Sequence, residues 1–317
     1  MLTLFVLNAV IATTSKQQLS PLGVFYGAML ALLGFILYRG SDGYTLPDEK
    51  GRVFSVLRMR RLCAGLGAAL CLIGVGAYVL IPQEYVTINA YHAMTRGVLM
   101  TAENPETALD AFSINEQYAL LNKTLYYDDV PLISFESEQL QQEFYANYGF
   151  FGIATYYLTH PDSLLRMTRL AVENAWAVRP ASLGNFAREA GFAPGAQTGF
   201  FTLCSTFTRR AMPRTVGFIV VWAATILACC RKDRGRLCIL LVTVLMGLSQ
   251  IVISIIGAGD ADVSKHIFLF NVAFDLVSFV ALAAALNWVY ARVRAPGEEK
   301  KKRERRGRAK RAPSLPA

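Results

Sequence analysis

Hydrophobic residues in this chain are grouped in long runs rather than alternating with polar ones. Three runs precede residue 82 and three follow residue 213. A helix needs about 20 apolar residues to cross a bilayer, and most of the runs approach that length. The pattern predicts an all-α polytopic membrane protein with about six transmembrane helices. The expected spans are residues 1–13 (short), 20–38, 62–81, 214–230, 237–256 and 266–290.

The runs divide the chain into four parts. Three amino-terminal spans occupy residues 1–81, with a polar loop at 39–61. A separate domain covers 82–213, three carboxy-terminal spans cover 214–292, and a basic tail covers 293–317. The tail has much charge and little apolar content, so we expect it to be disordered.

No stretch of residues 82–213 is long and apolar enough to be a clear span, but the region carries helix signals. Asn104 followed by Pro105 is typical of a helix start. Residues 148–159 are apolar and aromatic but short, which suggests an interfacial or re-entrant element. Residues 162–178 place apolar side chains at helical spacing. We therefore expect a helical domain here.

Composition supports the membrane assignment. The chain is 54% hydrophobic and 17% charged, whereas soluble domains carry about 25% charged residues. The net charge of +9 does not imply a nucleic-acid partner, because the basic residues lie beside the apolar runs and in the tail.

The distribution of charge predicts the orientation. Residues 39–61 hold six basic and three acidic residues, and 300–311 hold nine basic ones. Residues 82–213 hold eight basic and thirteen acidic residues, a net charge of −5. Because Lys and Arg favour cytoplasmic loops, we expect a multi-pass cell-membrane protein with the domain outside and the carboxyl terminus in the cytoplasm. The tail would then lie near anionic lipid heads.

The densest group of polar residues lies between the last two apolar runs, at Gly257–Asp275. Asp260, Asp262, Lys265 and His266 fall within seven residues, on the expected external side. Such a group could bind a metal, a phosphate or a sugar. The alternative is an exposed loop in which Asp262 or Ser264 caps the last helix.

Two polar residues continue into the last span. Asn271 and Asp275 are four apart, so they are expected to share one helix face. A carboxylate in hydrocarbon costs a few kcal/mol and usually marks a functional site. A hydrogen-bonded contact between packed helices is an equally good interpretation.

Asp128 and Asp129 are the tightest carboxylate pair outside the membrane. Paired carboxylates can hold a divalent metal through their oxygens, although adjacent residues in a turn often point apart. The sequence leaves the metal requirement open. The motifs of serine hydrolases, phosphate-binding loops and zinc proteases are absent from the sequence.

Several stretches together resemble a known group of proteins: Arg179–Phe186, Phe200–Phe207, Met212–Phe218 and Gly259–Asp275. They are similar to the carboxy-terminal half of bacterial membrane hexose transferases of surface-glycan biosynthesis. That group is placed among multi-spanning glycosyltransferases that use lipid-phosphate sugar donors. Such enzymes usually carry a catalytic acid in the first external loop, but the corresponding residues 13–19 contain no Asp or Glu. No catalytic residue can therefore be transferred from the family.

The resemblance implies transfer of a hexose from a polyprenyl-phosphate donor to a surface glycan at the external face of the bilayer. In this hypothesis Asp260 or Asp262 is the general base. Arg179, Lys265 or His266 would neutralise the donor phosphate, and Asn271 and Asp275 would also bind substrate. Two alternatives remain open: a transporter or flippase for a lipid-linked sugar, and a non-catalytic membrane subunit with a partner chain.

Overall fold

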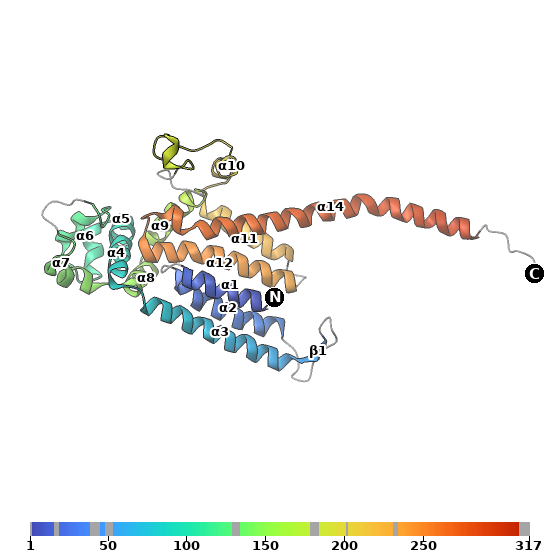
Figure 1. Ribbon diagram of the computed structural model, residues 1–317, viewed down its shortest axis with the longest axis horizontal. Coiled ribbons are helices and arrows are strands. Elements are labelled where there is room, and N and C mark those ends of the chain that lie inside the picture. Colours follow the sequence, from blue (N-terminus) through green and yellow to red (C-terminus); the bar gives the residue numbers. More distant parts are fainter. Residues whose placement is uncertain are drawn as a thin grey trace, which may run out of the picture.

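The computed structural model describes residues 2–15, 19–38, 45–47, 53–128, 134–177, 184–200, 202–230 and 234–310. It shows an all-α membrane protein, in which each of the six predicted apolar segments contains a helix. These helices run side by side in a bundle, with the helical domain at one end (Figure 1). The bundle helices are α1 (Leu2–Ser15), α2 (Pro21–Leu37), α3 (Val56–Val79), α11 (Val216–Cys230), α12 (Arg234–Ala258) and α14 (Phe268–Lys310).

The six helices differ in how well their length fits a bilayer. Among the described residues, three stretches are long and apolar enough to span: Val56–Val79, Leu237–Ala258 and Phe268–Tyr290. The helix α11 has 15 residues and passes the same test only together with the helix before it, from which it is bent by 104°. The helices α1 and α2 are apolar but shorter, with 14 and 17 residues.

Close backbone contact joins α2 to α3. A Cβ atom added to Gly23 would lie 2.6 Å from the Cα of Gly74. Small residues let membrane helices approach in this way, because no side chain separates the backbones.

The domain between the bundle halves consists of short helices. Asn104 accepts hydrogen bonds from the backbone N–H groups of Glu106 and Thr107, which confirms the predicted helix start. Its elements are α4 (Gln83–Ala93), the π-helix η2 (Met94–Val98), α5 (Leu99–Thr101), α6 (Pro105–Asp110), η3 (Glu116–Leu121), α7 (Glu138–Glu143), η4 (Tyr145–Asn147), α8 (Phe150–Thr159), α9 (Pro161–Asn174), η5 (Arg188–Ala190) and α10 (Leu203–Ala211).

The domain shares one hydrophobic core with the bundle ends. Trp176, fully buried after α9, has its ring centroid 4.7 Å from that of Phe274 and 5.6 Å from that of Phe270, both in α14. Its indole N–H donates to the Pro213 carbonyl at 3.2 Å. Because aromatic packing of this kind is desolvated and directional, it fixes the domain on the bundle.

Two features at the opposite end of the bundle were not expected. A short antiparallel hairpin, β1 (Thr45–Pro47) and β2 (Val53–Ser55), precedes α3. The backbone of α14 is helical to Lys310, whereas the sequence pattern predicts a disordered tail from residue 293. Lys, Arg, Glu and Ala are strong helix formers, and Glu298 and Glu299 lie four residues before Lys302 and Arg303. These preferences favour helix after residue 297, but Pro296 and Gly297 disfavour it, so local preference does not explain the whole continuation.

Candidate functional site

The turn with the aspartates connects α12 to the short helix α13 (Val263–His266). Its backbone is left-handed at two positions, with φ of 61° at Gly259 and 52° at Asp262. The turn is not an exposed loop. It rests on the π-helix η2, where the Asp260 N–H donates to the Arg96 carbonyl at 3.1 Å.

A pair of glycines allows this contact. A Cβ atom on Gly259 would lie 2.6 Å from the carbonyl carbon and oxygen of Arg96, and one on Gly97 would lie 3.3 Å from the Gly259 Cα. Left-handed φ also favours glycine, which lacks the Cβ that clashes there. The backbone of the turn therefore packs directly on the backbone of η2, at a π-helix of the kind often found at functional sites.

Asp260 forms a two-pronged ion pair with Arg96. The guanidinium Nε donates to Oδ1 at 2.6 Å and its Nη2 donates to Oδ2 at 2.9 Å, while Nη1 donates to the Lys123 carbonyl at 2.8 Å. Side-chain exposure is 27% for Arg96 and 16% for Asp260. Both carboxylate oxygens are thus occupied, and the pair holds the turn to the domain. The sequence pattern did not single out Arg96, which is the only Lys or Arg between residues 82 and 122.

His92 lies one turn before Arg96 and serves as an acceptor. Its Nε2 accepts the Tyr126 N–H at 3.0 Å. Burial lowers the pKa of His92 below its usual value, and the neighbouring Arg96 guanidinium lowers it further. The imidazole is therefore held neutral, which is the form that can accept this hydrogen bond.

Asp262 and Lys265 form a second, exposed ion pair. The ammonium donates to Oδ2 at 2.7 Å, with 59% of the Asp262 side chain and 40% of the Lys265 side chain exposed. The Asp262 side chain does not cap α13, because its left-handed backbone departs from the extended conformation of a capping residue. Asp262 is thus more accessible than Asp260.

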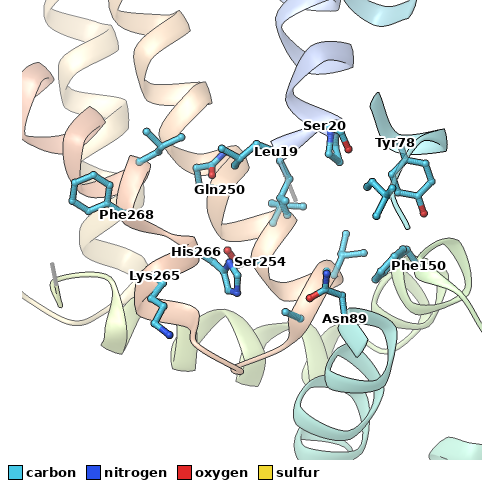
Figure 2. Close-up of a pocket in the computed structure, with 18 of the residues that line it drawn as sticks. Leu19, Ser20, Tyr78, Asn89, Phe150, Gln250, Ser254, Lys265, His266 and Phe268 are labelled. Atoms are coloured by element: carbon cyan, nitrogen blue, oxygen red, sulfur yellow. The ribbon is translucent and has the colours of Figure 1, made fainter. Parts of the chain in front are cut away.

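A cavity of about 620 Å³ opens beside this turn. Its walls are mostly apolar and come from both halves of the bundle and from the domain. Lys265 and His266 lie on it, together with Asn89 of α4 and with Gln250 and Ser254 of α12 (Figure 2). It also includes Ser20, just before α2. No sequence pattern predicted that residues near 20, 89 and 250 would lie beside residues 265 and 266.

Two polar groups of this cavity are buried without a protein partner. Gln250 is 1% exposed and Ser20 is fully buried. The Gln250 Nε2 and the Ser20 hydroxyl have no hydrogen bond to any part of the chain that the structure describes. An unsatisfied buried donor costs about 1–3 kcal/mol, and both of these groups belong to residues on the wall of the cavity.

Asn271 and Asp275 do not share a buried face. Asn271 is 3% exposed, and its amide donates to the Ala175 carbonyl. The Asp275 side chain is exposed on the outer side of α14, and no described residue forms a hydrogen bond or ion pair with it. Neither residue lines the cavity at the turn or the second cavity, of about 390 Å³, between α8, α9, α11 and α12.

The acidic pair proposed for metal binding is only partly described. The exposed Asp128 carboxylate accepts the Leu125 N–H at 2.6 Å, which closes a turn. Asp129 and Arg179 lie outside the described residues. In the described parts of the chain, no three His, Cys, Asp or Glu side chains are grouped in a way that could hold a metal ion.

Comparison with known proteins places the chain in a family. The description "YfdI N-terminal transmembrane domain" matches residues 1–306. The chain belongs to this family. No curated protein and no solved structure gives a significant match. The match covers nearly the whole chain and describes an amino-terminal domain, whereas the resemblance noted above was to the carboxy-terminal half of hexose transferases. It supports a membrane protein and agrees with a place in cell-envelope glycan biosynthesis.

Proposed function

We propose that this YfdI-type transmembrane domain binds a polyprenyl-phosphate hexose in the 620 Å³ cavity and takes part in moving the hexose to a surface glycan. The observation that carries the proposal is the composition of this cavity. It combines apolar walls, two buried donors without partners, and the basic residues Lys265 and His266.

Each part of the cavity fits a part of that donor. The apolar walls suit the first isoprene units, whose burial is favourable by about 25 cal/mol per Å². Lys265 offers a charged donor and His266 a ring N–H to the phosphate. Gln250 and Ser20 belong to the same wall, and a rotation of either side chain would present its buried donor to an oxygen atom in the cavity. Only a ligand with both a long apolar chain and an anionic, oxygen-rich head uses all three.

The two aspartates take different roles in this proposal. Asp260, with both oxygens bound by Arg96, positions the turn. Asp262, exposed beside Lys265, is the candidate general base. It would remove the proton of the acceptor hydroxyl as that oxygen bonds to the anomeric carbon, and the polyprenyl phosphate would leave with the electrons of the broken C–O bond.

Binding of a defined lipid tests the proposal. The full natural protein, purified in detergent, is titrated with a polyprenyl-phosphate hexose and the bound lipid is measured by native mass spectrometry. Lys265→Gln and His266→Gln should each weaken binding about 10- to 100-fold, because each removes a hydrogen bond to a charged group. Lys123→Gln is the matched control, since Lys123 is exposed and outside the cavity. Equal binding by all variants would disprove the assignment of the site.

Transfer assays with the same variants separate the enzyme from the transporter alternative. If the protein is a transferase, Asp262→Asn lowers hexose transfer while lipid binding stays unchanged. Movement of the lipid-linked sugar across vesicle membranes without any transfer would support a transporter instead.

A partner-subunit role is favoured by one observation, the exposed Asp275 carboxyl in a spanning helix. An ionisable side chain inside a membrane is normally directed at protein or water rather than lipid. A second membrane chain with a hydrogen-bond donor at this depth would satisfy it. Asp275→Asn should retain copurification of such a chain and Asp275→Leu should abolish it; equal copurification of both variants would rule this contact out.

A further inference from the structure

The helix α10 lies across the direction of the bundle rather than along it. Its segment Ser205–Ala211 makes an angle of 104° with Val216–Cys229 of α11, which runs beside the other spans. Figure 1 shows α10 set off from the bundle, beside the end of α11 that is nearer the domain. A helix at right angles to a span, near the end of a bundle, has the orientation of one that lies along a membrane surface.

The polarity of α10 is reversed relative to a helix on a water-exposed surface. Leu203 and Phe207 are each 65% exposed, and the preceding Phe200 is 81% exposed. Ser205 and Thr206, by contrast, are partly buried. A surface helix in water turns its apolar side toward the protein, whereas α10 turns it away. This arrangement is stable where the surroundings of Leu203 and Phe207 are apolar.

Three arginines surround the corner between α10 and α11. Arg209 and Arg210 end α10 and are exposed, and the Arg214 guanidinium donates to the Arg209 carbonyl at 3.0 Å. Aspartate and glutamate are absent from residues 202–230, the described stretch that contains both helices. The corner therefore has a local positive charge with no acidic residue near it in sequence.

We propose that α10 is an interfacial helix whose apolar side lies among acyl chains and whose arginines bind the phosphates of anionic lipids in the same leaflet. Amphipathic helices of this composition lie in the plane of the interface, with apolar area and basic residues both contributing to binding. The inference concerns a lipid surface rather than the cavity ligand, so it does not depend on the proposed function. It assigns Phe200 and residues 202–214 as a contact of the domain with the bilayer.

Site-specific photo-crosslinking in nanodiscs tests which molecules contact α10. Benzoylphenylalanine replaces Leu203 or Phe207 in the full chain, and Ser205 in a control on the opposite, less exposed side of the helix. Positions 203 and 207 should give lipid adducts, and position 205 should give adducts within the protein. Adducts of 203 and 207 to a copurifying protein or a second copy of the chain, or no lipid adducts, would overturn the proposal.

The same probe measures the preference for anionic lipid. In nanodiscs with equal phosphatidylglycerol and phosphatidylcholine, position 207 should crosslink preferentially to phosphatidylglycerol. Arg209→Gln with Arg210→Gln should reduce this preference by about fivefold per arginine, and Lys123→Gln with Arg169→Gln, two exposed residues elsewhere in the domain, should not. A preference that is absent, or unchanged in the first double variant, would contradict binding of lipid phosphate by the arginines.

Discussion

At the residue scale, the contact that organises the site joins Arg96 to Asp260, which are 164 positions apart. The guanidinium connects the aspartate turn to the domain and also binds the Lys123 carbonyl. Losing one partner leaves a half-buried charge without its counterion, which costs more than losing an exposed pair. The two ion pairs of the turn are therefore expected to differ in their contribution to stability.

A double-mutant cycle tests this difference. Arg96→Gln and Asp260→Asn should each lower the free energy of unfolding by about 1–3 kcal/mol, and together by less than their sum. Asp262→Asn and Lys265→Gln, which remove the exposed pair, should each cost less than about 1 kcal/mol. Unfolding in detergent, followed by circular dichroism, gives these values. Additive effects of Arg96→Gln and Asp260→Asn would show that the two groups do not interact.

Gly259 of the turn and Gly257, near the end of α12, allow a matched comparison, because the same methyl group can be added at each. Gly259→Ala should be strongly destabilising, because its φ is 61° and the Cβ would lie 2.6 Å from the backbone of Arg96. The strain of a left-handed residue alone is about 1–3 kcal/mol. Gly257→Ala should be neutral or stabilising, since a Cβ there meets no atom within 4 Å. Equal melting temperatures for the two variants would contradict the packing of the turn on η2.

Of the ion pair between Arg96 and Asp260, the sequence pattern predicted only Asp260 as a site residue. The density of charge at Asp260–His266 is visible in the sequence, whereas Arg96 gains its importance only from a contact between distant segments. Conversely, Asn271 and Asp275 have the spacing of one helix face, yet the first is buried and the second exposed. A rotation of about 40° between positions four apart is enough to cross the edge of a packed face.

At the element scale, hydrophobic runs located all six bundle helices because length and apolarity are local properties. The predicted cap at Asn104 is also confirmed, since a cap involves only neighbouring residues. The break at Ile267 between α13 and α14 and the right-angle turn before α11 are not marked by length or apolarity. The sequence pattern alone did not predict them.

The stability of the protein is expected to depend on pH through His92 of α4, which accepts the Tyr126 N–H. The pKa of His92 is lowered by burial and by Arg96, so near pH 6.5 and below the unfolded chain binds more protons than the folded one. Stability should therefore fall as pH decreases from about 6.5 toward the folded-state pKa, by up to about 1.4 kcal/mol per pH unit.

One variant isolates this contribution. His92→Gln should flatten the dependence of the melting temperature on pH between pH 7 and 5, because an amide oxygen can still accept the Tyr126 N–H but does not titrate in this range. The unaltered protein, measured in the same buffers, gives the reference slope. The interpretation of His92 is wrong if its replacement does not alter the slope.

At the scale of the whole molecule, the two ends of the bundle carry opposite net charge. Figure 1 places the hairpin and the distal part of α14 at one end of the bundle and the helices α4 to α9 at the other. The described parts of the basic segments, residues 53–61 and 292–310, thus lie opposite the acidic domain, as expected for helices that cross a bilayer in alternating directions.

Reporter fusions test the orientation. Alkaline phosphatase, active only outside the cytoplasm, should be active when fused after residue 150 and inactive when fused after Ala317. A green fluorescent protein fusion, fluorescent only in the cytoplasm, should give the reverse pattern. The same reporter active at both positions would contradict the proposed sidedness and would remove the external acceptor from the account.

The most direct test of the central claim is to locate the bound lipid. A polyprenyl-phosphate hexose with a photoreactive group in its first isoprene units is crosslinked to the protein in nanodiscs, and modified peptides are mapped by mass spectrometry. The proposal predicts adducts at cavity residues within 250–269 and 78–89, suppressed by excess unlabelled lipid. Adducts confined to the outer faces of α3 or α14, and insensitive to competition, would show that the cavity does not hold this lipid.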